Sequence, residues 1–263
     1  MDASARLTTL TRVGFAARGL LYIVIALLVI RAGRAENPSG ALQYLAQGGG
    51  RVLLVVMAAG LVAYSLWRLA DAAFDVERHG SDQDGIRERL GAAASGAVHL
   101  LLAWQAVRLI QGVASAGGDG TRGGARTALQ LPGGATLVVV AGAVLLGVGA
   151  FQLVKAAKAS FLRHLEPSVA RQPWAKWSGR AGYAARGLVF LISGAFLIKA
   201  GLEERASEAG GTAEALSWLS SPLDVLVALG LFAFGVFSLI EARFRVLHDV
   251  PVGGMVGRAT GRS

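Results

Sequence analysis

Six long runs of apolar residues, each nearly free of charge, are separated by polar segments along the chain. The runs span residues 13–30, 52–67, 90–107, 132–154, 181–198 and 222–240. A helix needs about 20 residues to cross the roughly 30 Å apolar core of a bilayer, whereas a strand of a membrane barrel needs only about ten. The only prolines in these runs, Pro132 and Pro222, are first residues, so no proline interrupts a run. Their length and composition therefore predict six transmembrane helices.

An eleven-residue segment opens the first, third and fifth of these runs. The first copy is Arg12-Val-Gly-Phe-Ala-Ala-Arg-Gly-Leu-Leu-Tyr22, and the other two begin at Arg89 and Arg180. The second copy differs, because Ser95 replaces the inner arginine and His99 replaces the aromatic residue. Such self-similarity at a fixed spacing indicates a repeat architecture.

The even-numbered runs repeat as well, since an Ala-Leu pair precedes each of them at nearly the same distance. These pairs are Ala41-Leu42, Ala128-Leu129 and Ala215-Leu216. The chain is therefore predicted to be all-α, a single membrane domain over 1–263 with two-helix repeats at approximately 12–78, 89–158 and 180–245. Each unit crosses the membrane twice, so the units are parallel, and we expect a pseudo-threefold arrangement about an axis along the membrane normal.

Composition supports a membrane protein and narrows its chemistry. The chain is 54% hydrophobic and 16% charged, whereas a soluble domain carries about 25% charged residues. There is no cysteine, and the four histidines are scattered, so neither a metal site nor a cofactor is expected. The phosphate-binding, zinc-protease and serine-hydrolase motifs are missing from the sequence. We therefore expect no enzyme.

The distribution of charge predicts an orientation. Of the 26 lysines and arginines, 18 lie on the side of the termini and the even-to-odd linkers, and eight lie in the hairpin loops. The positive-inside rule then places both termini in the cytoplasm. Arginine outnumbers lysine 22 to 4, which is typical of a GC-rich bacterial genome and points to the bacterial inner membrane. The net charge of +9 follows from this orientation, so the expected partners are the bilayer and its anionic headgroups, not nucleic acid.

The paired Gly-[Phe/Tyr]-Ala-Ala-Arg-Gly-Leu segments at Gly14 and Gly182 resemble the bacterial domain-of-unknown-function family 1206. Its members are small six-helix membrane proteins built from three two-helix units. The resemblance covers most of the chain and implies a fold and a membrane location. It implies no activity and no functional residue.

Glycines recur at two positions of the eleven-residue segment. Small residues let membrane helices approach closely, so all six are expected to serve helix packing. They are Gly14, Gly91 and Gly182 on one helical face, and Gly19, Gly96 and Gly187 on the adjacent face.

Arg18 and Arg186 lie six residues beyond Arg12 and Arg180, about 9 Å deeper at 1.5 Å per residue. Two interpretations are open for them. Each could extend its side chain to headgroup phosphates, or each could face inward and pair with an acid. For the second case, we expect Arg186 to bind Glu241 of its own hairpin.

In the first unit the corresponding acids are Asp71 and Asp75 at the end of the second apolar run. In the second unit Ser95 stands for the arginine and Lys155 for the acid. The simultaneous loss of both partners fits pairing, whereas the preferred interpretation of the two arginines is extension to the headgroups, which is common near helix ends.

His99 and Gln152 are the other polar candidates at membrane depth. A titratable residue there is a functional candidate, but we favour a hydrogen-bonded packing role for His99, because no acidic residue lies within its apolar run. Gln152 aligns with Ser65 and Ser238, which indicates a position that hydrogen-bonds between helices.

Three classes of function follow. We favour a non-enzymatic structural, regulatory or interaction component of the membrane, with a homo-oligomer or a membrane-protein partner left open. The alternative is a pathway for a small solute or ion along the axis, which requires a polar stripe of His99, Gln152 and the two arginines. A membrane enzyme ranks last. A cavity lined by His99 and Gln152 would favour the pathway, and an axis packed with glycine and leucine would favour the first class.

Overall fold

The computed structural model describes residues 3–33, 35–47, 50–77, 80–113 and 120–246. Over this part of the chain the fold is helical, and the only β-type pairing is an isolated bridge between Leu165 and Arg245. Six helices are long and apolar enough to cross a membrane, which confirms the sequence prediction. They are α1 (Ala3–Ala32), α3 (Arg51–Phe74), α4 (Gln83–Ile110), α6 (Gly134–Lys158), α8 (Pro173–Leu202) and α10 (Leu223–Phe244).

Short helices fill segments that the sequence presented as loops. On the hairpin side these are α2 (Pro38–Gln47), α5 (Gly120–Leu129), η2 (Ala206–Glu208) and α9 (Thr212–Trp218), and on the other side η1 (Ser160–His164) and α7 (Pro167–Ala170). The Ala-Leu pairs lie in α2, α5 and α9. Leu42 and Leu216 are fully buried, so these segments become helical because one side packs against the long helices.

Two long helices begin about one or two turns earlier than their apolar runs. α4 begins at Gln83, where the carboxylate of Asp82 accepts a hydrogen bond from the N–H of Gly85 at 2.9 Å. α8 begins at Pro173, and proline suits the first turn of a helix. Hydrophobicity marks only the apolar part of a helix, so the charged linkers are shorter than predicted.

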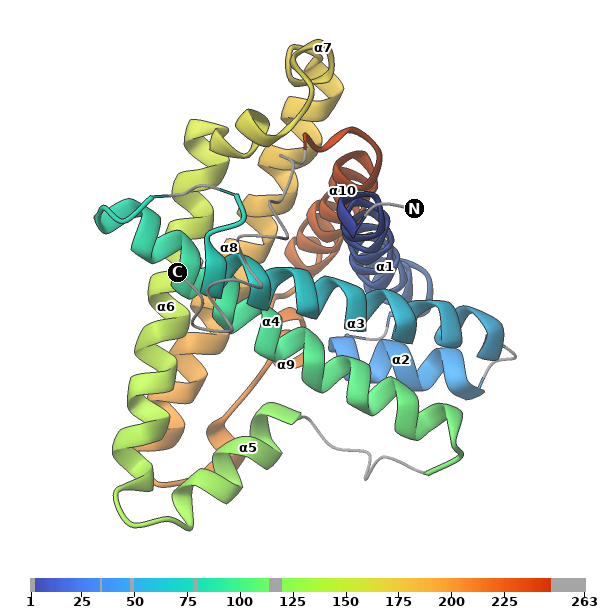
Figure 1. The fold of residues 1–263 in the computed structure, drawn as a ribbon. Helices are drawn as coiled ribbons and strands as arrows, with labels where there is room; N and C mark the ends of the chain where they lie inside the picture. Colours follow the sequence, from blue (N-terminus) through green and yellow to red (C-terminus); the bar gives the residue numbers. More distant parts are fainter. Residues whose placement is uncertain (1–2, 34, 48–49, 78–79, 114–119, 247–263) are drawn as a thin grey trace.

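The long helices pack in a definite order, α4–α3–α1–α10–α8–α6. The pairs α3/α4, α6/α8 and α1/α10 lie side by side in Figure 1, and each joins the even helix of one unit to the odd helix of another. Within the first and third units, α1 packs on α3 and α8 packs on α10. These contacts follow a pseudo-threefold ring that is open where α4 would pack on α6.

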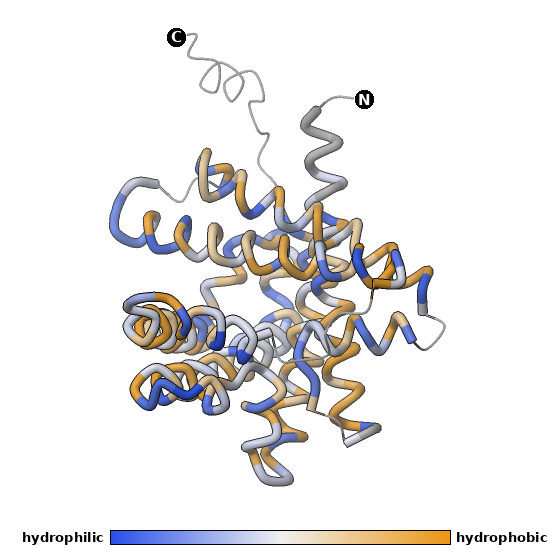
Figure 2. The backbone as a smooth tube through the Cα atoms, turned by 90° about the horizontal axis from the view of Figure 1, so that it is seen from below, coloured by the Kyte–Doolittle hydropathy of each residue, from blue (hydrophilic) through white to orange (hydrophobic). Residues whose placement is uncertain are grey.

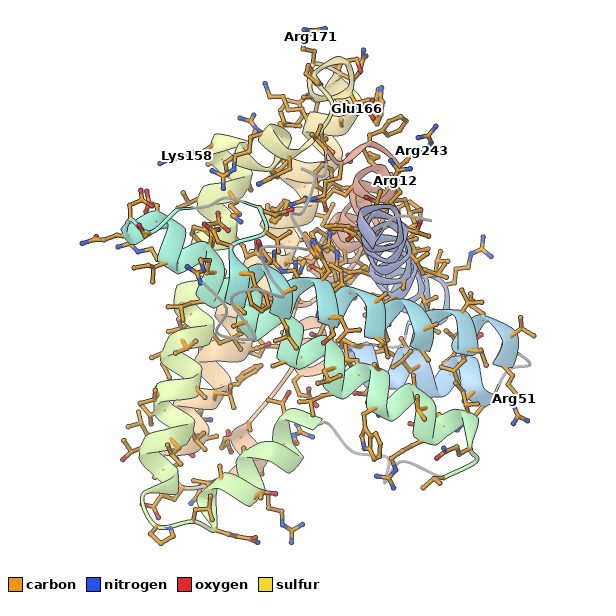
Figure 3. All side chains as sticks on the ribbon, in the orientation of Figure 1. Arg12, Arg51, Lys158, Glu166, Arg171 and Arg243 are labelled. Carbon is orange, nitrogen blue, oxygen red and sulfur yellow. The ribbon has the colours of Figure 1, made fainter. Side chains whose placement is uncertain are left out.

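Polar and apolar residues separate as expected for a membrane protein. Apolar residues follow the long helices, and hydrophilic residues gather at turns (Figure 2). Figure 3 places Arg12, Lys158, Arg171 and Arg243 toward one end of the molecule and Arg51 at the far end of α3. The clustered end carries the linkers that the charge count assigned to the cytoplasm.

Glycines lie at the crossings that join one unit to the next. A Cβ added to Gly19 would lie 2.7 Å from the carbonyl oxygen of Gly235, and one added to Gly187 would lie 2.9 Å from that of Gly149. At the third crossing, a Cβ on Gly96 would lie 2.8 Å from Leu69. A larger residue at any of the three positions would push the helices apart.

The crossings within units one and three are as close. A Cβ added to Gly14 would lie 2.7 Å from the Cα of Tyr64, and one added to Gly182 would lie 2.5 Å from the Cα of Phe234. Gly91, the equivalent in the second unit, has nothing within 4 Å. The packing role expected of all six glycines is therefore seen at five of them.

The sequence explains why the second unit stays open. Leu69, Leu153 and Leu239 each contact the equivalent glycine of a neighbouring odd helix, so they occupy the same place in the three units. Nine residues earlier, Gly60 and Gly230 admit Ala17 and Ala185 at close contact. The second unit has Val144 at that position, and Val148 in place of the aromatic side chains of Tyr64 and Phe234. It lacks both the recess and the aromatic residue that hold the other units together.

The interior between the helices is filled with apolar side chains. One continuous cluster joins α1, α2, α3, α4, α8, α9 and α10. Its largest fully buried members are Leu21, Ile25, Leu42, Leu54, Met57, Leu61, Leu216, Leu231 and Phe234. Leu42 and Leu216 come from the short helices on the hairpin side, so that end of the interior is closed.

Candidate functional site

Arg18 of α1 is buried in the interior, with 5% of its surface exposed. Its guanidinium donates hydrogen bonds to the Ser238 hydroxyl at 3.1 Å, the Tyr64 hydroxyl at 2.5 Å and the Glu241 carboxylate at 2.5 Å. It also lies over the ring of Phe234, 5.0 Å from its centroid. Each face and each nitrogen has a partner, so Arg18 faces the protein and not the lipid.

Glu241 of α10 joins this arginine to a second one. Arg245, one turn further along the chain, donates a short hydrogen bond to the other carboxylate oxygen of Glu241. Arg245 also holds both oxygens of Glu77, at 2.8 Å from Nε and 2.7 Å from Nη2. We call Arg18, Glu241, Arg245 and Glu77 the central ion network.

The central ion network balances two positive charges with two negative ones in a buried environment. Burying a single unpaired ion costs several kcal/mol, so each member depends on the others. Because Glu77 follows α3, the network ties α1, the end of α3 and the end of α10 on the side of the linkers between units. This geometry is better suited to holding the three helices together than to acid–base chemistry, because every charge is already paired.

Glu77 and His164 lie in the linkers outside the membrane-spanning segments. Burial alone would raise the pKa of Glu77, but the guanidinium of Arg245 outweighs it and lowers that pKa from 4.5 to about 2. Burial, followed by the positive charge of Arg245, lowers the pKa of His164 from 6.5 to about 3. The His164 Nε2 lies 3.9 Å from the Glu77 carboxylate, which is too far to offset these effects.

These pKa values predict a protein that loses stability in acid. His164 takes up a proton below 6.5 when unfolded but only near 3 when folded, so stability falls as the pH drops through that window. Glu77 adds a second loss between 4.5 and about 2 for the same reason. We expect the wild type to lose more stability than His164→Gln between neutral pH and about pH 5.

Detergent-solubilised protein unfolded by SDS at each pH would measure this difference. The His164→Gln variant keeps every other titrating group, so the difference between its pH profile and that of the wild type reports on His164 alone. Parallel pH profiles for the two proteins would contradict the assignment.

The central ion network has two altered copies. Counting from Leu69, Leu153 and Leu239, the residues equivalent to Glu241 are Asp71 and Lys155. The glycine contacts therefore define three junctions: Arg18 with Glu241, Ser95 with Asp71, and Arg186 with Lys155. Only the first brings a cation and an acid together.

Glu241 was expected to bind Arg186, and this is wrong: its partners are Arg18 and Arg245. The physical reason is that Gly235 and Glu241 of α10 lie against α1, whereas α10 meets α8 through Gly230. Asp71 and Asp75 were expected near Arg18, and neither is its partner among the described residues.

Asp71 is fully buried, accepts a hydrogen bond from the Glu77 N–H at 2.9 Å and lies 3.4 Å from Arg68. Asp75 ends α3 in a left-handed conformation and accepts a hydrogen bond from the Gly80 N–H at 3.0 Å. Asp71 thus holds the linker that carries Glu77, and Asp75 shapes the turn that follows α3.

Arg186 of α8 makes no ion pair within the described part of the chain. Its guanidinium lies over three rings, 4.4 Å from the centroid of Phe234, 5.2 Å from that of Tyr22 and 5.0 Å from that of Phe190. Its Nε is buried without a hydrogen-bond partner, and the rest of the side chain is partly exposed. The first and third copies of the eleven-residue segment thus differ: Arg18 is fully paired, whereas Arg186 contacts only aromatic faces.

Lys155 forms its ion pair with a residue of α4. Its ammonium lies 2.8 Å from Glu88, and Arg163 lies 3.2 Å from the same carboxylate. The start of α4 and the end of α6 therefore meet through this ion cluster, and the two helices diverge beyond it (Figure 1). Two cations share one acid there, so the cluster has a positive excess.

His99 and Gln152 are both buried but do not meet. The Nδ1 of His99 lies 2.7 Å from the Ser95 carbonyl oxygen, and its ring lies 4.5 Å from that of Tyr64. Gln152 is on α6 at the position of Ser238, as predicted, but the alignment with Ser65 was wrong by one turn. Ser65 donates to the Gly96 carbonyl oxygen at 2.8 Å. The Gly triplet before α3 lengthens that unit and accounts for the shift.

Four residues of these ion clusters, Glu77, Glu88, Tyr64 and Arg245, were not predicted from the sequence as site residues. Arg245 could have been found, because it follows Glu241 by four residues, a spacing that brings helical side chains together. No local signal marked Glu77 or Glu88, which lie among many charged residues between the second and third apolar runs.

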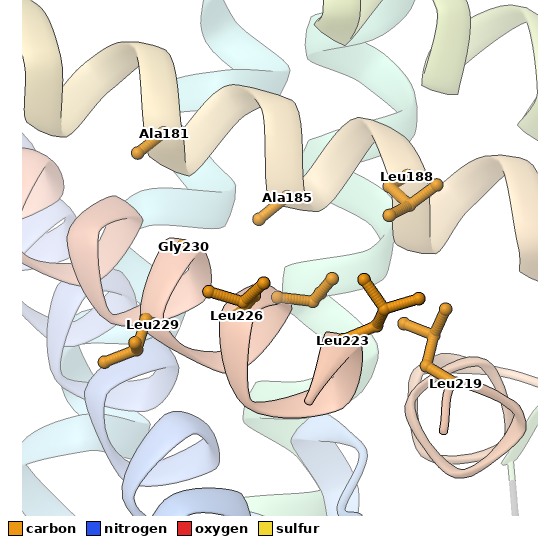
Figure 4. A pocket seen from close by; sticks show the side chains of 9 residues that line it. Ala181, Ala185, Leu188, Leu219, Leu223, Leu226, Leu229 and Gly230 are labelled. Atoms are coloured by element: carbon orange, nitrogen blue, oxygen red, sulfur yellow. The ribbon is translucent and has the colours of Figure 1, made fainter. Parts of the chain in front are cut away.

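Two cavities in the described part of the structure lie away from these residues. The first, about 490 Å³, is an apolar groove between α8, α9 and α10 lined by Ala185, Leu226 and Gly230 among others (Figure 4). The second, about 410 Å³, lies at the hairpin-side ends of α3 and α4 near Arg51. Neither is lined by His99 or Gln152. In the described residues, no three potential metal ligands gather.

Comparison with known proteins gives a consistent result. The family described as Domain of Unknown Function (DUF1206) matches residues 13–75, 90–159 and 181–245, three segments that fit the threefold repeat. The chain is 30% identical over 247 residues to a protein of Bacillus subtilis (strain 168), "Uncharacterized protein YxxB", covering 89% of this chain and 90% of that protein. No solved structure matches the chain significantly.

Proposed function

The chain belongs to the DUF1206 family, and from this premise we propose that it is a non-enzymatic interaction component of the bacterial cytoplasmic membrane. Its binding surface is the pair of unpacked helix faces in the second repeat. We call this surface the second-repeat edge and define it by Gly91, Ala94 and Val98 of α4 and Val144 and Val148 of α6.

The observation that carries the proposal is the exposure of positions that are buried in the other two units. Leu21 and Val189 are 1% and 2% exposed. Val98 occupies the same place in the repeat and is 54% exposed. The second-repeat edge is entirely apolar, and an apolar helix face in a membrane binds either lipid or another helix.

A pathway along the axis is less well supported. It needs a continuous polar stripe, whereas the interior carries Leu54, Leu61, Leu231 and Phe234 where such a stripe would run. His99 and Gln152 belong to different helix pairs, and the polar groups of Arg18 are all in use. An enzymatic role has still less support, because the buried acids are held in ion pairs.

The orientation with both termini in the cytoplasm rests on the charge count and on the position of the central ion network. Glu77, Glu88, Arg163 and Arg245 all lie on the side with 18 of the 26 basic residues. This side also carries Trp174 and Trp177, both exposed, as expected for residues at a membrane interface.

The proposal predicts that filling the second-repeat edge abolishes binding of a discrete partner. The protein would be extracted from its native membrane in a mild detergent and weighed by native mass spectrometry. We expect the wild type to carry a bound species of defined mass and Gly91→Trp to lose it, because Gly91 has open space around it. The matched control is Val52→Trp on α3, a position already 80% exposed, which should keep the bound species.

Two results would overturn the proposal. One is a wild type that carries no bound mass at all. The other is equal retention by Gly91→Trp and Val52→Trp.

A further inference from the structure

We infer that the second-repeat edge binds an anionic phospholipid of the cytoplasmic leaflet, with its phosphate held by Arg186. This rests on the proposed function and names the partner of the same surface. The inference starts from the contrast between two copies of one segment. Arg18 has three hydrogen-bond partners, whereas Arg186 has a buried Nε with none.

The missing partner of Arg186 is an anion. At the equivalent junction Arg18 meets Glu241, but the repeat puts Lys155 opposite Arg186. The positive charge of Arg186 is therefore left over, resting on Tyr22, Phe190 and Phe234. Aromatic faces attract a cation, but they do not neutralise it.

Arg186 is at the right depth and on the right side to meet a molecule bound at the second-repeat edge. Because the repeats are parallel, Arg186 lies at the depth of Ser95, one helical turn from Gly91. Gly187, the next residue of α8, lies in close contact with Gly149 of α6, and Gly149 directly follows Val148 of the second-repeat edge. Helical side chains tilt toward the helix N-terminus, so in the proposed orientation the Arg186 side chain extends toward the cytoplasmic leaflet.

The charge at the entrance favours an acidic headgroup. Lys155 and Arg163 share the single carboxylate of Glu88, and this cluster joins α4 to α6 where they diverge. A phosphate with apolar tails matches both parts of the surface: the tails cover the apolar second-repeat edge, and the phosphate meets the cations. An apolar transmembrane helix of another protein would cover the second-repeat edge but would leave Arg186 without an anion.

Binding of phosphatidylglycerol tests the inference. Delipidated wild-type protein would be titrated with phosphatidylglycerol, and separately with phosphatidylcholine, and bound lipid counted by native mass spectrometry. We expect phosphatidylglycerol to bind more tightly than phosphatidylcholine. We expect Arg186→Gln to weaken the binding of phosphatidylglycerol roughly tenfold or more, because a charge-assisted hydrogen bond is lost.

The controls separate this site from general attraction. Arg171→Gln removes an exposed charge on the same side and should leave the affinity unchanged, while Arg186→Lys should restore part of it. Competition by inorganic phosphate distinguishes a lipid from a soluble anion. Circular dichroism of each variant shows that it is folded.

Equal binding by Arg186→Gln and wild type would overturn the inference, as would displacement of the lipid by millimolar inorganic phosphate. If the mass lost from Gly91→Trp is a protein, this inference fails while the proposed function stands. If Gly91→Trp loses nothing, the proposed function fails on its own.

Discussion

Replacing Arg18 with methionine should lower the free energy of unfolding by about 3–5 kcal/mol, the usual cost of leaving a buried charge without its partner. The substitution strands Glu241 and leaves the hydroxyls of Tyr64 and Ser238 without their donor. Arg186→Met is the matched control, since it makes the same change at the same place in another repeat. Arg186 has no ion pair, so its loss should cost about 1 kcal/mol or less, the value of exposed cation–aromatic contacts.

SDS-induced unfolding of the purified protein, followed by circular dichroism, would measure both values. Equal destabilisation by the two variants would contradict the assignment. A double-mutant cycle sharpens the test: Arg18→Met and Glu241→Leu should be strongly non-additive, because they share an ion pair. Arg186→Met and Glu241→Leu should be close to additive.

Gly182→Leu should destabilise the protein by about 3 kcal/mol or more, and Gly91→Leu should change its stability by less than about 0.5 kcal/mol. An added Cβ at Gly182 would lie 2.5 Å from the backbone of Phe234, so α8 and α10 would have to separate. The same residue at Gly91 meets nothing within 4 Å. Both substitutions change glycine to leucine in a membrane helix, so helix propensity and hydrophobicity cancel in the comparison.

The same unfolding measurement applies here, with Gly14→Leu as a second packed position that should behave like Gly182→Leu. A destabilised Gly91→Leu would mean that α4 and α6 pack in the membrane after all. It would remove the second-repeat edge along with the proposal built on it.

The long apolar runs and the eleven-residue segment were enough to predict six helices, three repeats and the family. Hydrophobic length is a local property, and the repeated Gly and Arg positions are visible without any partner. The pairing of Glu241 was not predictable in this way. Its partner Arg18 is 223 residues away, and sequence proximity favoured Arg186 of the same hairpin.

The predicted alignment of Ser65 with Gln152 and Ser238, on the second long helix of each unit, was wrong for a related reason. Matching Ser65 to Ser238 relied on similar side chains, and the three glycines at 48–50 shift the first unit by about one turn. Close contacts at Gly19, Gly96 and Gly187 fix the register physically. The open second unit is visible in the sequence only afterwards, as Val144 where the others carry glycine.

The pairing of Arg18 with Glu241 also sets an order of events during synthesis. α1 leaves the ribosome first, while α10 follows roughly 10–45 seconds later at about 5–20 residues per second, because 223 residues separate the two partners. Throughout that interval Arg18 has no carboxylate to neutralise it. The core around Arg18 is therefore completed only when α10 is inserted. Insertion of the last of the six long helices thus completes the pairing of the first.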